Sequence, residues 1–214
     1  MASSIGSVPP SQIATYTTAN IQALTTQDVA ALTTAQIAIL STTQVAAFTV
    51  SQMVFSAQQL QAFSNDDIAA FSPADIEALK SNQVQALSAG QVDAITSGQL
   101  AGLSTASIRE FSRAQVGYLT TAQLNALSTD QIQAISTAQL GGLTTGQLAA
   151  LSTANLSALS SKVTQLTTAQ VRALTTDQLN ALSTADMREF SATQLGALTT
   201  DQLGGSAPAT CRRC

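Results

Sequence analysis

The residues of this sequence that could carry out chemistry are few, and the most suggestive are the last four, CRRC. Cys211 and Cys214 are the only cysteines and have the CxxC spacing found in redox and metal-binding motifs. A metal ion would need two more ligands from another chain, so we expect no metal here. Two interpretations stay open: a flexible tail with free or locally oxidised thiols, and an intermolecular disulfide.

Other catalytic groups are sparse. The chain has no histidine, the side chain that most often serves in acid–base catalysis and metal binding. Asp66 and Asp67 are adjacent, but they fall in the first turn of a predicted helix, where negative charge suits the helix dipole. There is no Gly-rich phosphate loop, and the many serines and threonines are interpreted as helix caps rather than as activated nucleophiles. We therefore expect no catalytic residue, no cofactor and no enzymatic activity.

Composition narrows the class of protein further. Charged residues make up 9 % of the chain, where about 25 % is typical. Apolar residues are at an ordinary 45 %, and no run of them is long enough to cross a membrane. Lysine and arginine do not cluster before the tail, so we expect no binding to nucleic acid.

An eight-residue period organises the chain. One apolar series steps by eight residues, with two steps of seven, from Met53 to Leu60 and from Leu156 to Val163. A second apolar series precedes each member by five positions. The first series begins Ile13, Ile21, Val29 and Ile37 and runs to Leu203, and the second begins Tyr16, Leu24 and Leu32 and runs to Leu198.

Each octad also carries the signals that start a helix. A serine or threonine follows every member of the second series except at Lys80, and most of these hydroxyl residues have a glutamine three positions later. This is a capping box, and the flanking apolar residues form the matching hydrophobic staple. We predict that structural capping is carried out by such pairs as Thr120 and Gln123, Ser128 and Gln131, and Thr144 and Gln147.

These signals predict an all-α repeat solenoid of short capped helices, one per octad. Such a helix is unstable alone and must be held by its neighbours. A β-solenoid is the alternative, because threonine, valine and isoleucine are abundant. Threonine recurs at every third cap over part of the chain, which favours three octads per turn, with two or four left open. We expect a lead-in at 1–8, the solenoid at 9–203 and a tail at 204–214.

Three local features have structural explanations. The residue before each leading apolar position is usually alanine or glycine, as at Gly102 and Gly142, which suits close approach of backbones. The two seven-residue units, near 48–54 and 159–165, are expected to bend or re-phase the solenoid. Four phenylalanines occupy successive leading apolar positions and are predicted to lie in the core: Phe48, Phe55, Phe63 and Phe71.

The phrase LTTAQLNALS at 119–128, with its variants over about residues 13–203, resembles the octad arrays of very long bacterial surface or secreted proteins. These proteins are commonly labelled heme utilisation or adhesion proteins. The resemblance implies an extracellular repeat domain with an adhesin-like role.

The sequence as a whole therefore predicts a non-enzymatic structural module, adhesin-like or self-assembling, whose partner is a second copy stacked end to end or another surface. The alternative is a binding surface in which threonine pairs engage ice or a polysaccharide. We expect an extracellular or cell-surface location, although the first residues do not form a recognisable signal peptide. The pairs are Thr25–Thr26, Thr120–Thr121, Thr144–Thr145 and Thr167–Thr168.

Overall fold

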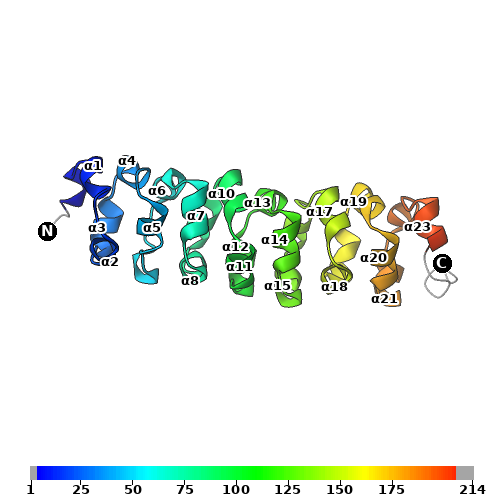
Figure 1. Ribbon diagram of the computed structural model, residues 1–214. Helices are drawn as coiled ribbons and strands as arrows, with labels where there is room; N and C mark the ends of the chain where they lie inside the picture. The colour runs from blue at the N-terminus through cyan, green and yellow to red at the C-terminus, as the bar shows by residue number, and fades with distance from the viewer. Residues whose placement is uncertain (1–3, 206–214) are drawn as a thin grey trace. The chain divides into compact units, whose positions relative to one another are not determined.

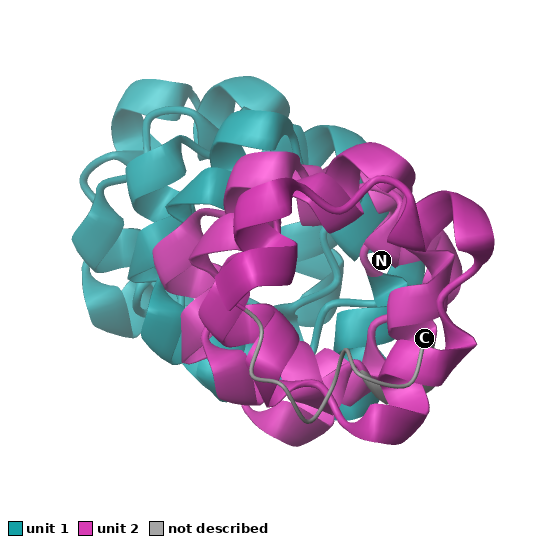
Figure 2. Cartoon of the chain, turned by 90° about the vertical axis from the view of Figure 1, so that its right-hand side faces the viewer, with its two compact units in different colours: residues 1–110 teal, residues 111–214 magenta. Residues whose placement is uncertain are grey.

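The computed structural model describes residues 4–205, without the side chains of residues 160 and 161. This part of the chain consists of short helices and contains no strand (Figure 1). The predicted all-α repeat solenoid is therefore confirmed, and the β-solenoid alternative is wrong. No described helix has the length and hydropathy needed to cross a membrane. The chain divides into two compact units, unit 1 (residues 1–110) and unit 2 (residues 111–214), coloured separately in Figure 2.

Unit 1 contains twelve α-helices and two 3₁₀-helices in its described part. In chain order they are η1 (Ile5–Ser7), α1 (Pro10–Ile13), α2 (Thr18–Gln22), α3 (Thr26–Ala31), α4 (Thr34–Ile37), α5 (Thr42–Val45), η2 (Val50–Gln52), α6 (Ala57–Ala62), α7 (Asn65–Ala70), α8 (Pro73–Glu77), α9 (Ser81–Ala86), α10 (Ala89–Ala94), α11 (Ser97–Ala101) and α12 (Thr105–Glu110).

Unit 2 contains eleven α-helices and one 3₁₀-helix in its described part, and they follow one another around a ring (Figure 2). In chain order they are α13 (Arg113–Tyr118), α14 (Thr121–Ala126), α15 (Thr129–Ala134), α16 (Thr137–Leu140), α17 (Thr145–Ala150), α18 (Thr153–Ala158), η3 (Ser160–Gln165), α19 (Thr168–Ala173), α20 (Thr176–Ala181), α21 (Thr184–Glu189), α22 (Ala192–Leu195) and α23 (Thr200–Gly205).

One octad of unit 2 shows how the sequence forms each helix. Thr120 has an extended backbone and accepts from the third N–H of α14, which begins at the next residue. Leu124 is completely buried. The helix ends at Ala126 because Leu127 returns to an extended conformation, with its N–H donating to the carbonyl of Leu124. Leu127 is buried and directly precedes the next cap, Ser128. One apolar residue thus closes one helix and opens another.

Within each unit the helices stack in coils. Helices three elements apart contact each other, such as α6 with α9 in unit 1 and α14 with α17 in unit 2. This spacing agrees with the three-octad prediction. However, side chains also bond to backbone groups between 24 and 31 residues away. These distances correspond to between three and four octads. One coil therefore does not contain a whole number of octads, and one helix can lie beside two helices of the next coil.

The two apolar series form the core of each unit. Leu119 and Leu124 of unit 2 are both buried, as are most of their equivalents along the described chain. The four phenylalanines of unit 1 are also buried, as predicted. Phe55 lies at the centre of this group, with its ring centroid 5.2 Å from that of Phe48 and 5.1 Å from that of Phe63, in edge-to-face contacts. These are favourable geometries for aromatic pairs.

The two seven-residue units fold as 3₁₀-helices, η2 and η3. A 3₁₀-helix turns in three residues instead of 3.6, which suits a unit that lacks one residue. Gln52 at the end of η2 still bonds to the carbonyls of Ile21 and Leu24, at 2.8 Å and 2.7 Å. The shorter unit therefore keeps the position of its glutamine. That these units bend the solenoid stays a prediction.

The exceptional cap at Lys80 leads to a first testable prediction. Gln83 accepts from the Lys80 N–H at 2.7 Å, but the ammonium group of Lys80 cannot accept from the N–H of Gln83. Lys80→Ser supplies the missing acceptor and should stabilise the fold by about 1 kcal/mol. Chemical denaturation checks this, with Lys80→Ala as the control that removes the charge without adding an acceptor. Equal stability of the two variants would contradict the prediction.

Candidate functional site

The capping residues singled out from the sequence form reciprocal hydrogen bonds. Thr120 Oγ1 accepts from the Gln123 N–H at 3.1 Å, and Gln123 Oε1 accepts from the Thr120 N–H at 2.6 Å. The same pair of bonds joins Ser128 to Gln131, at 3.2 Å and 2.8 Å. It also joins Thr144 to Gln147, at 3.1 Å and 2.7 Å. These hydroxyls and amide oxygens are thus engaged at the helix start.

The glutamines have a second role that the sequence analysis missed. Gln147 is buried, and its Nε2 donates to the carbonyls of Val116, Gly117 and Leu119 at 3.1, 3.2 and 2.5 Å. These carbonyls lie in the last turn of α13 and just after it, one coil earlier in the chain. The same amide bond to the preceding coil is made by Gln36, Gln44, Gln52, Gln59, Gln83, Gln91, Gln99, Gln139, Gln170, Gln178, Gln194 and Gln202.

This double role explains why the residue is glutamine. The helix dipole at this position would favour glutamate. A carboxylate can accept from the cap N–H but cannot donate to the carbonyls of the preceding coil, whereas an amide does both. One buried side chain therefore joins the start of a helix to the end of another, in agreement with the rule that buried polar groups are hydrogen-bonded. The sequence signal for this role was the preference for a neutral residue at a position that suits an acid.

Two octads make the junction with another donor. Asn155 reaches the carbonyls of Leu124 and Leu127 through Nδ2 at 3.3 Å and 3.4 Å. In the second seven-residue unit, Lys162 Nζ donates to the carbonyls of Gln133 and Ile135. The ammonium group is a donor like the amide, so these substitutions keep the direction of the bond while they change its chemistry.

The octad that begins at Ser104 receives its cap acceptor from the preceding coil. Ser107 stands where glutamine is usual, and Glu77 Oε2 accepts from the Ser104 N–H at 3.0 Å. Burial acts to raise the pKa of Glu77, but hydrogen bonds from the Ser104 backbone and from the Ser104 and Ser107 hydroxyls bring it below its usual value. The sequence analysis gave no indication of this contact, because Glu77 lies 27 residues before its partner.

This contact gives a pH prediction. A folded-state pKa below the unfolded value means that the Glu77 contribution to stability is present above the unfolded pKa and is lost as pH falls through the folded pKa. Titration of the Glu77 carboxyl by ¹³C NMR should show the lowered pKa, and Ser107→Ala should raise it by removing one donor. An unchanged pKa in Ser107→Ala would contradict the assignment.

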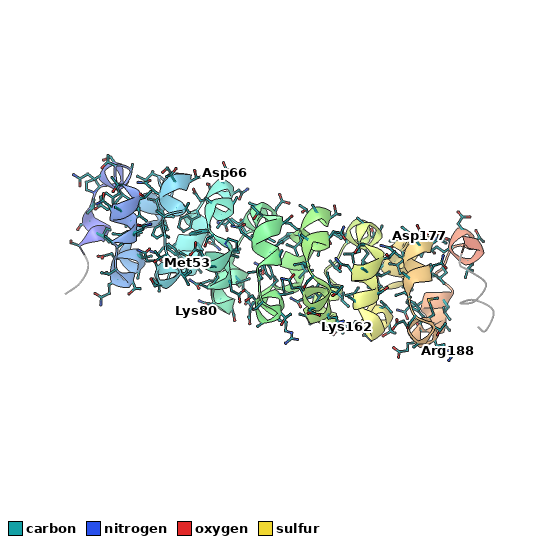
Figure 3. The ribbon with its side chains drawn as sticks, turned by 60° about the horizontal axis from the view of Figure 1, so that its bottom comes forward. Met53, Asp66, Lys80, Lys162, Asp177 and Arg188 are labelled. Carbon is teal, nitrogen blue, oxygen red and sulfur yellow. The ribbon has the colours of Figure 1, made fainter. Side chains whose placement is uncertain are left out.

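Within residues 4–205 the acidic side chains do not gather into a group of three that could hold a metal. Asp66 is exposed, whereas its neighbour Asp67 is buried and accepts from the Ser64 N–H and hydroxyl at 2.9 Å and 2.7 Å. Asp66 lies in α7 and Lys80 directly precedes α9, and the two side chains lie apart in Figure 3. Residues 4–205 contain no group of three acidic or cysteine side chains that could hold a metal. Cys211 and Cys214 lie outside the described residues.

The threonine pairs separate into two roles. Thr144 is the cap of α17 and its hydroxyl accepts from the Gln147 N–H. Thr145 is exposed at the first position of the same helix. The helices α14, α17 and α19 contact one after another, and they begin at Thr121, Thr145 and Thr168. The hydroxyl of the first threonine of each pair therefore bonds to a backbone N–H, and the second threonine is exposed.

Glycine allows the coils to approach closely in unit 2. A Cβ atom on Gly142 would lie 1.9 Å from the carbonyl oxygen of Arg113, which belongs to the preceding coil. The Arg113 guanidinium also donates to the Gly141 carbonyl at 3.0 Å. The predicted close approach at this position is thus present, and a Cβ atom at Gly142 would force the neighbouring backbone to shift.

The model of the ALTTAQ repeat matches residues 21–55, 60–97, 68–105, 92–129, 126–161, 162–187 and 177–205. A comparison with curated proteins finds no significant match. Because these matches cover most of the chain and follow its octads, this protein belongs to the ALTTAQ repeat family.

Proposed function

We propose that this chain is a non-enzymatic structural module that acts through its surface, as an adhesin-like or self-associating protein outside the cell. The observation that supports the proposal most directly is the use of its polar groups. The cap hydroxyls and glutamine amides are engaged in the fold, as at Thr96 and Gln99, which bond to each other, and the Gln99 amide also bonds to the preceding coil. They are not available to bind or transform a substrate.

The remaining surface supports an associating role. The outward positions at the helix starts carry short neutral side chains, such as Thr121, Ala122 and Thr145. The whole chain has a formal net charge of −4 over 214 residues. A weakly charged surface offers little electrostatic repulsion to a second copy or to another neutral surface. The resemblance of the octads to arrays in bacterial surface proteins labelled heme utilisation or adhesion proteins implies the same role and an extracellular location.

The proposal can be tested by making that surface charged without disturbing the fold. The triple variant Thr121→Glu, Thr145→Glu, Thr168→Glu changes exposed first positions of helices, where a negative charge is favourable. We expect the wild type to be retained on cell-wall polysaccharide or hydrophobic beads, or to self-associate in sedimentation, and the variant to do so at least about tenfold more weakly. A wild type that neither associates nor is retained would refute the proposal.

A second candidate function has one observation in its favour. Thr121, Thr145 and Thr168 are exposed at the starts of three helices in contact, with hydroxyls that the caps do not use, which would suit binding to ice or to a polysaccharide. Thermal hysteresis and retention on immobilised glycans would test it. Thr→Val variants keep the shape and remove the hydroxyls, so they should abolish the binding, and wild-type protein without either activity would eliminate this candidate.

A further inference from the structure

We propose that Asp67 and Asp75 of unit 1 each bind a Ca²⁺ ion together with backbone carbonyls of the preceding coil. These two are the only charged side chains among the buried residues of the described chain. Each carboxylate leaves one oxygen without a partner, and each lies where the other octads of unit 1 place a hydrogen-bond donor. The inference goes beyond the associating role proposed above and does not depend on it.

Both carboxylates occupy the third position of their helices, α7 and α8, which glutamine holds in most octads. Asp67 is 4 % exposed and Asp75 is 2 % exposed. Oδ2 accepts from the N–H and the hydroxyl of the cap serine, at 2.9 Å and 2.7 Å for Asp67 and at 3.0 Å and 2.6 Å for Asp75. Neither carboxylate forms an ion pair within residues 4–205. Buried charges in proteins are normally paired or coordinate a metal, so both groups call for a cation.

The neighbouring octads establish which backbone groups lie opposite the third position. Gln59 Nε2 donates to the carbonyls of Val29 and Leu32 at 2.9 Å and 2.8 Å. The same bonds, at 3.1 Å and 2.8 Å, are made by Gln83 to the carbonyls of Met53 and Phe55. In each case the side chain faces the carbonyls of one apolar pair in the preceding coil.

Asp67 and Asp75 lie in the two octads between these glutamines, so the register on both sides applies to them. Asp67 therefore faces the carbonyls of Ile37 and Leu40. The equivalent carbonyls for Asp75 are those of Val45 and Phe48. A carboxylate has no hydrogen to donate, and no side chain within residues 4–205 donates to these four carbonyls. Each site thus places one carboxylate oxygen opposite two carbonyl oxygens, and all three are acceptors.

The second carboxylate oxygen, Oδ1, is the one directed at the carbonyls. A carboxylate is planar, so when Oδ2 turns to the cap, Oδ1 takes the direction that Nε2 takes in glutamine. Aspartate is one methylene shorter, which leaves room between Oδ1 and the carbonyls. Every completely buried side-chain oxygen or nitrogen within residues 4–205 has a hydrogen-bond partner. Because Oδ1 of Asp67 has none, it keeps some contact with solvent, and this contact gives a cation access.

The donor set identifies the class of cation. Carboxylate and carbonyl oxygens are ligands of hard cations, and Ca²⁺ accepts both of them, together with water, in a flexible geometry that Mg²⁺ does not tolerate. Backbone carbonyls supply two of the three protein ligands, so such a site needs no cluster of acidic side chains. Residues 64–79 also contain four carboxylates and no lysine or arginine, which attracts cations to these octads. With water completing the coordination, we expect a weak site with a Kd of about 10⁻³ M.

Two double variants remove the charge and keep the fold. Asp67→Gln with Asp75→Gln gives both octads the junction that Gln59 and Gln83 already make, so this variant should fold at least as stably as the wild type. Asp67→Asn with Asp75→Asn keeps the size of the side chains, and Asn155 shows that asparagine is accommodated at this position. The matched control changes two exposed acids by the same charge, Asp130→Asn with Asp177→Asn.

Titration with CaCl₂ at constant ionic strength, followed by ¹³C NMR, measures the binding. In the wild type and the control we expect saturable changes at the Asp67 carboxyl and at the backbone carbonyls of Ile37 and Leu40. In both double variants the carbonyl changes should require at least about tenfold more Ca²⁺. Ca²⁺ should also raise the denaturation midpoint of the wild type and the control, but not that of the glutamine variant, because only a folded site binds the ion.

Three results would overturn the inference. Equal carbonyl changes in the wild type and in the glutamine variant would show that Ca²⁺ acts elsewhere on the chain. Equal changes with NaCl at the same ionic strength would show screening rather than a site. A wild type that does not respond at Ca²⁺ concentrations well above the expected Kd would show that water alone separates these carboxylates from the carbonyls.

Discussion

Gln99→Glu should destabilise the fold by about 3 kcal/mol or more, although the two side chains have nearly the same shape. Gln99 is 2 % exposed and donates to the carbonyls of Ile68 and Phe71 at 2.9 Å and 2.6 Å. Glutamate keeps the acceptor for the Thr96 N–H, which glutamine binds at 2.6 Å. The variant therefore removes only the donors to the preceding coil, and it places a carboxylate against carbonyl oxygens. Chemical denaturation followed by circular dichroism measures the loss.

The pH dependence of this loss distinguishes its cause from a general packing defect. Burial beside carbonyl oxygens raises the pKa of the introduced carboxyl above its unfolded value. The penalty should therefore be smallest below the unfolded pKa, where the protonated acid can donate one bond, and should grow as pH rises through the folded pKa. Gln85→Glu at an exposed position is the matched control and should change stability by less than about 0.5 kcal/mol. A penalty in Gln99→Glu that does not change between acidic and neutral pH would contradict the explanation.

Gly142→Ala should also cost about 3 kcal/mol or more, for a steric reason. The added Cβ would lie 1.9 Å from the carbonyl oxygen and 2.9 Å from the carbonyl carbon of Arg113. Both atoms are backbone, so relief requires α13 to move away from the following coil. The movement would also disturb the bond from the Arg113 guanidinium to Gly141. The shift in the denaturation midpoint measures the effect.

Gly146→Ala in the same coil is the control for this variant. Its added Cβ would have only the Thr144 hydroxyl nearby, at 4.0 Å, and the position lies within α17. Alanine is the better helix former, so this substitution should stabilise the fold slightly, by up to about 1 kcal/mol. If both variants had the same midpoint, the close approach at Gly142 would not be a determinant of stability.

The local structure of this protein could be predicted from sequence because its signals lie within one octad. The cap, the box residue and the staple of the helix after Thr120 are separated by at most five residues, and each has one physical interpretation. The core followed from the same spacing, including the aromatic group around Phe55. These features depend on backbone geometry that neighbouring residues determine.

The relations between coils could not be predicted in the same way. The amide of Gln147 reaches carbonyls 28 to 31 residues earlier, and no local pattern specifies which backbone groups lie at that distance. The number of octads per coil depends on how side chains pack between coils. The threonine pattern at the caps therefore indicated which helices contact each other but not how many octads form one coil. Glu77 was missed for the same reason, because it replaces a cap acceptor from the preceding coil.

The double role of glutamine also bears on function. Polar groups that a binding or catalytic site would need are already engaged in hydrogen bonds within the fold. The amides of the buried capping-box glutamines, such as Gln99, are used at both of their ends, by a cap N–H and by the preceding coil. What faces outward is a surface of small, mostly neutral side chains. This distribution of polar groups is the physical basis for proposing a structural role and for seeking partners at the surface of the protein.

Hydrogen exchange of the glutamine side-chain amides, measured by NMR, tests the inter-coil role of glutamine most directly. The amide hydrogens of buried residues such as Gln99, Gln147 and Gln178 donate to backbone carbonyls and should exchange far more slowly than those of exposed Gln85 and Gln22. Two clearly separated classes of exchange rate are the expected result. Exchange of all glutamine amides at the rate of a free amide would show that they do not join the coils.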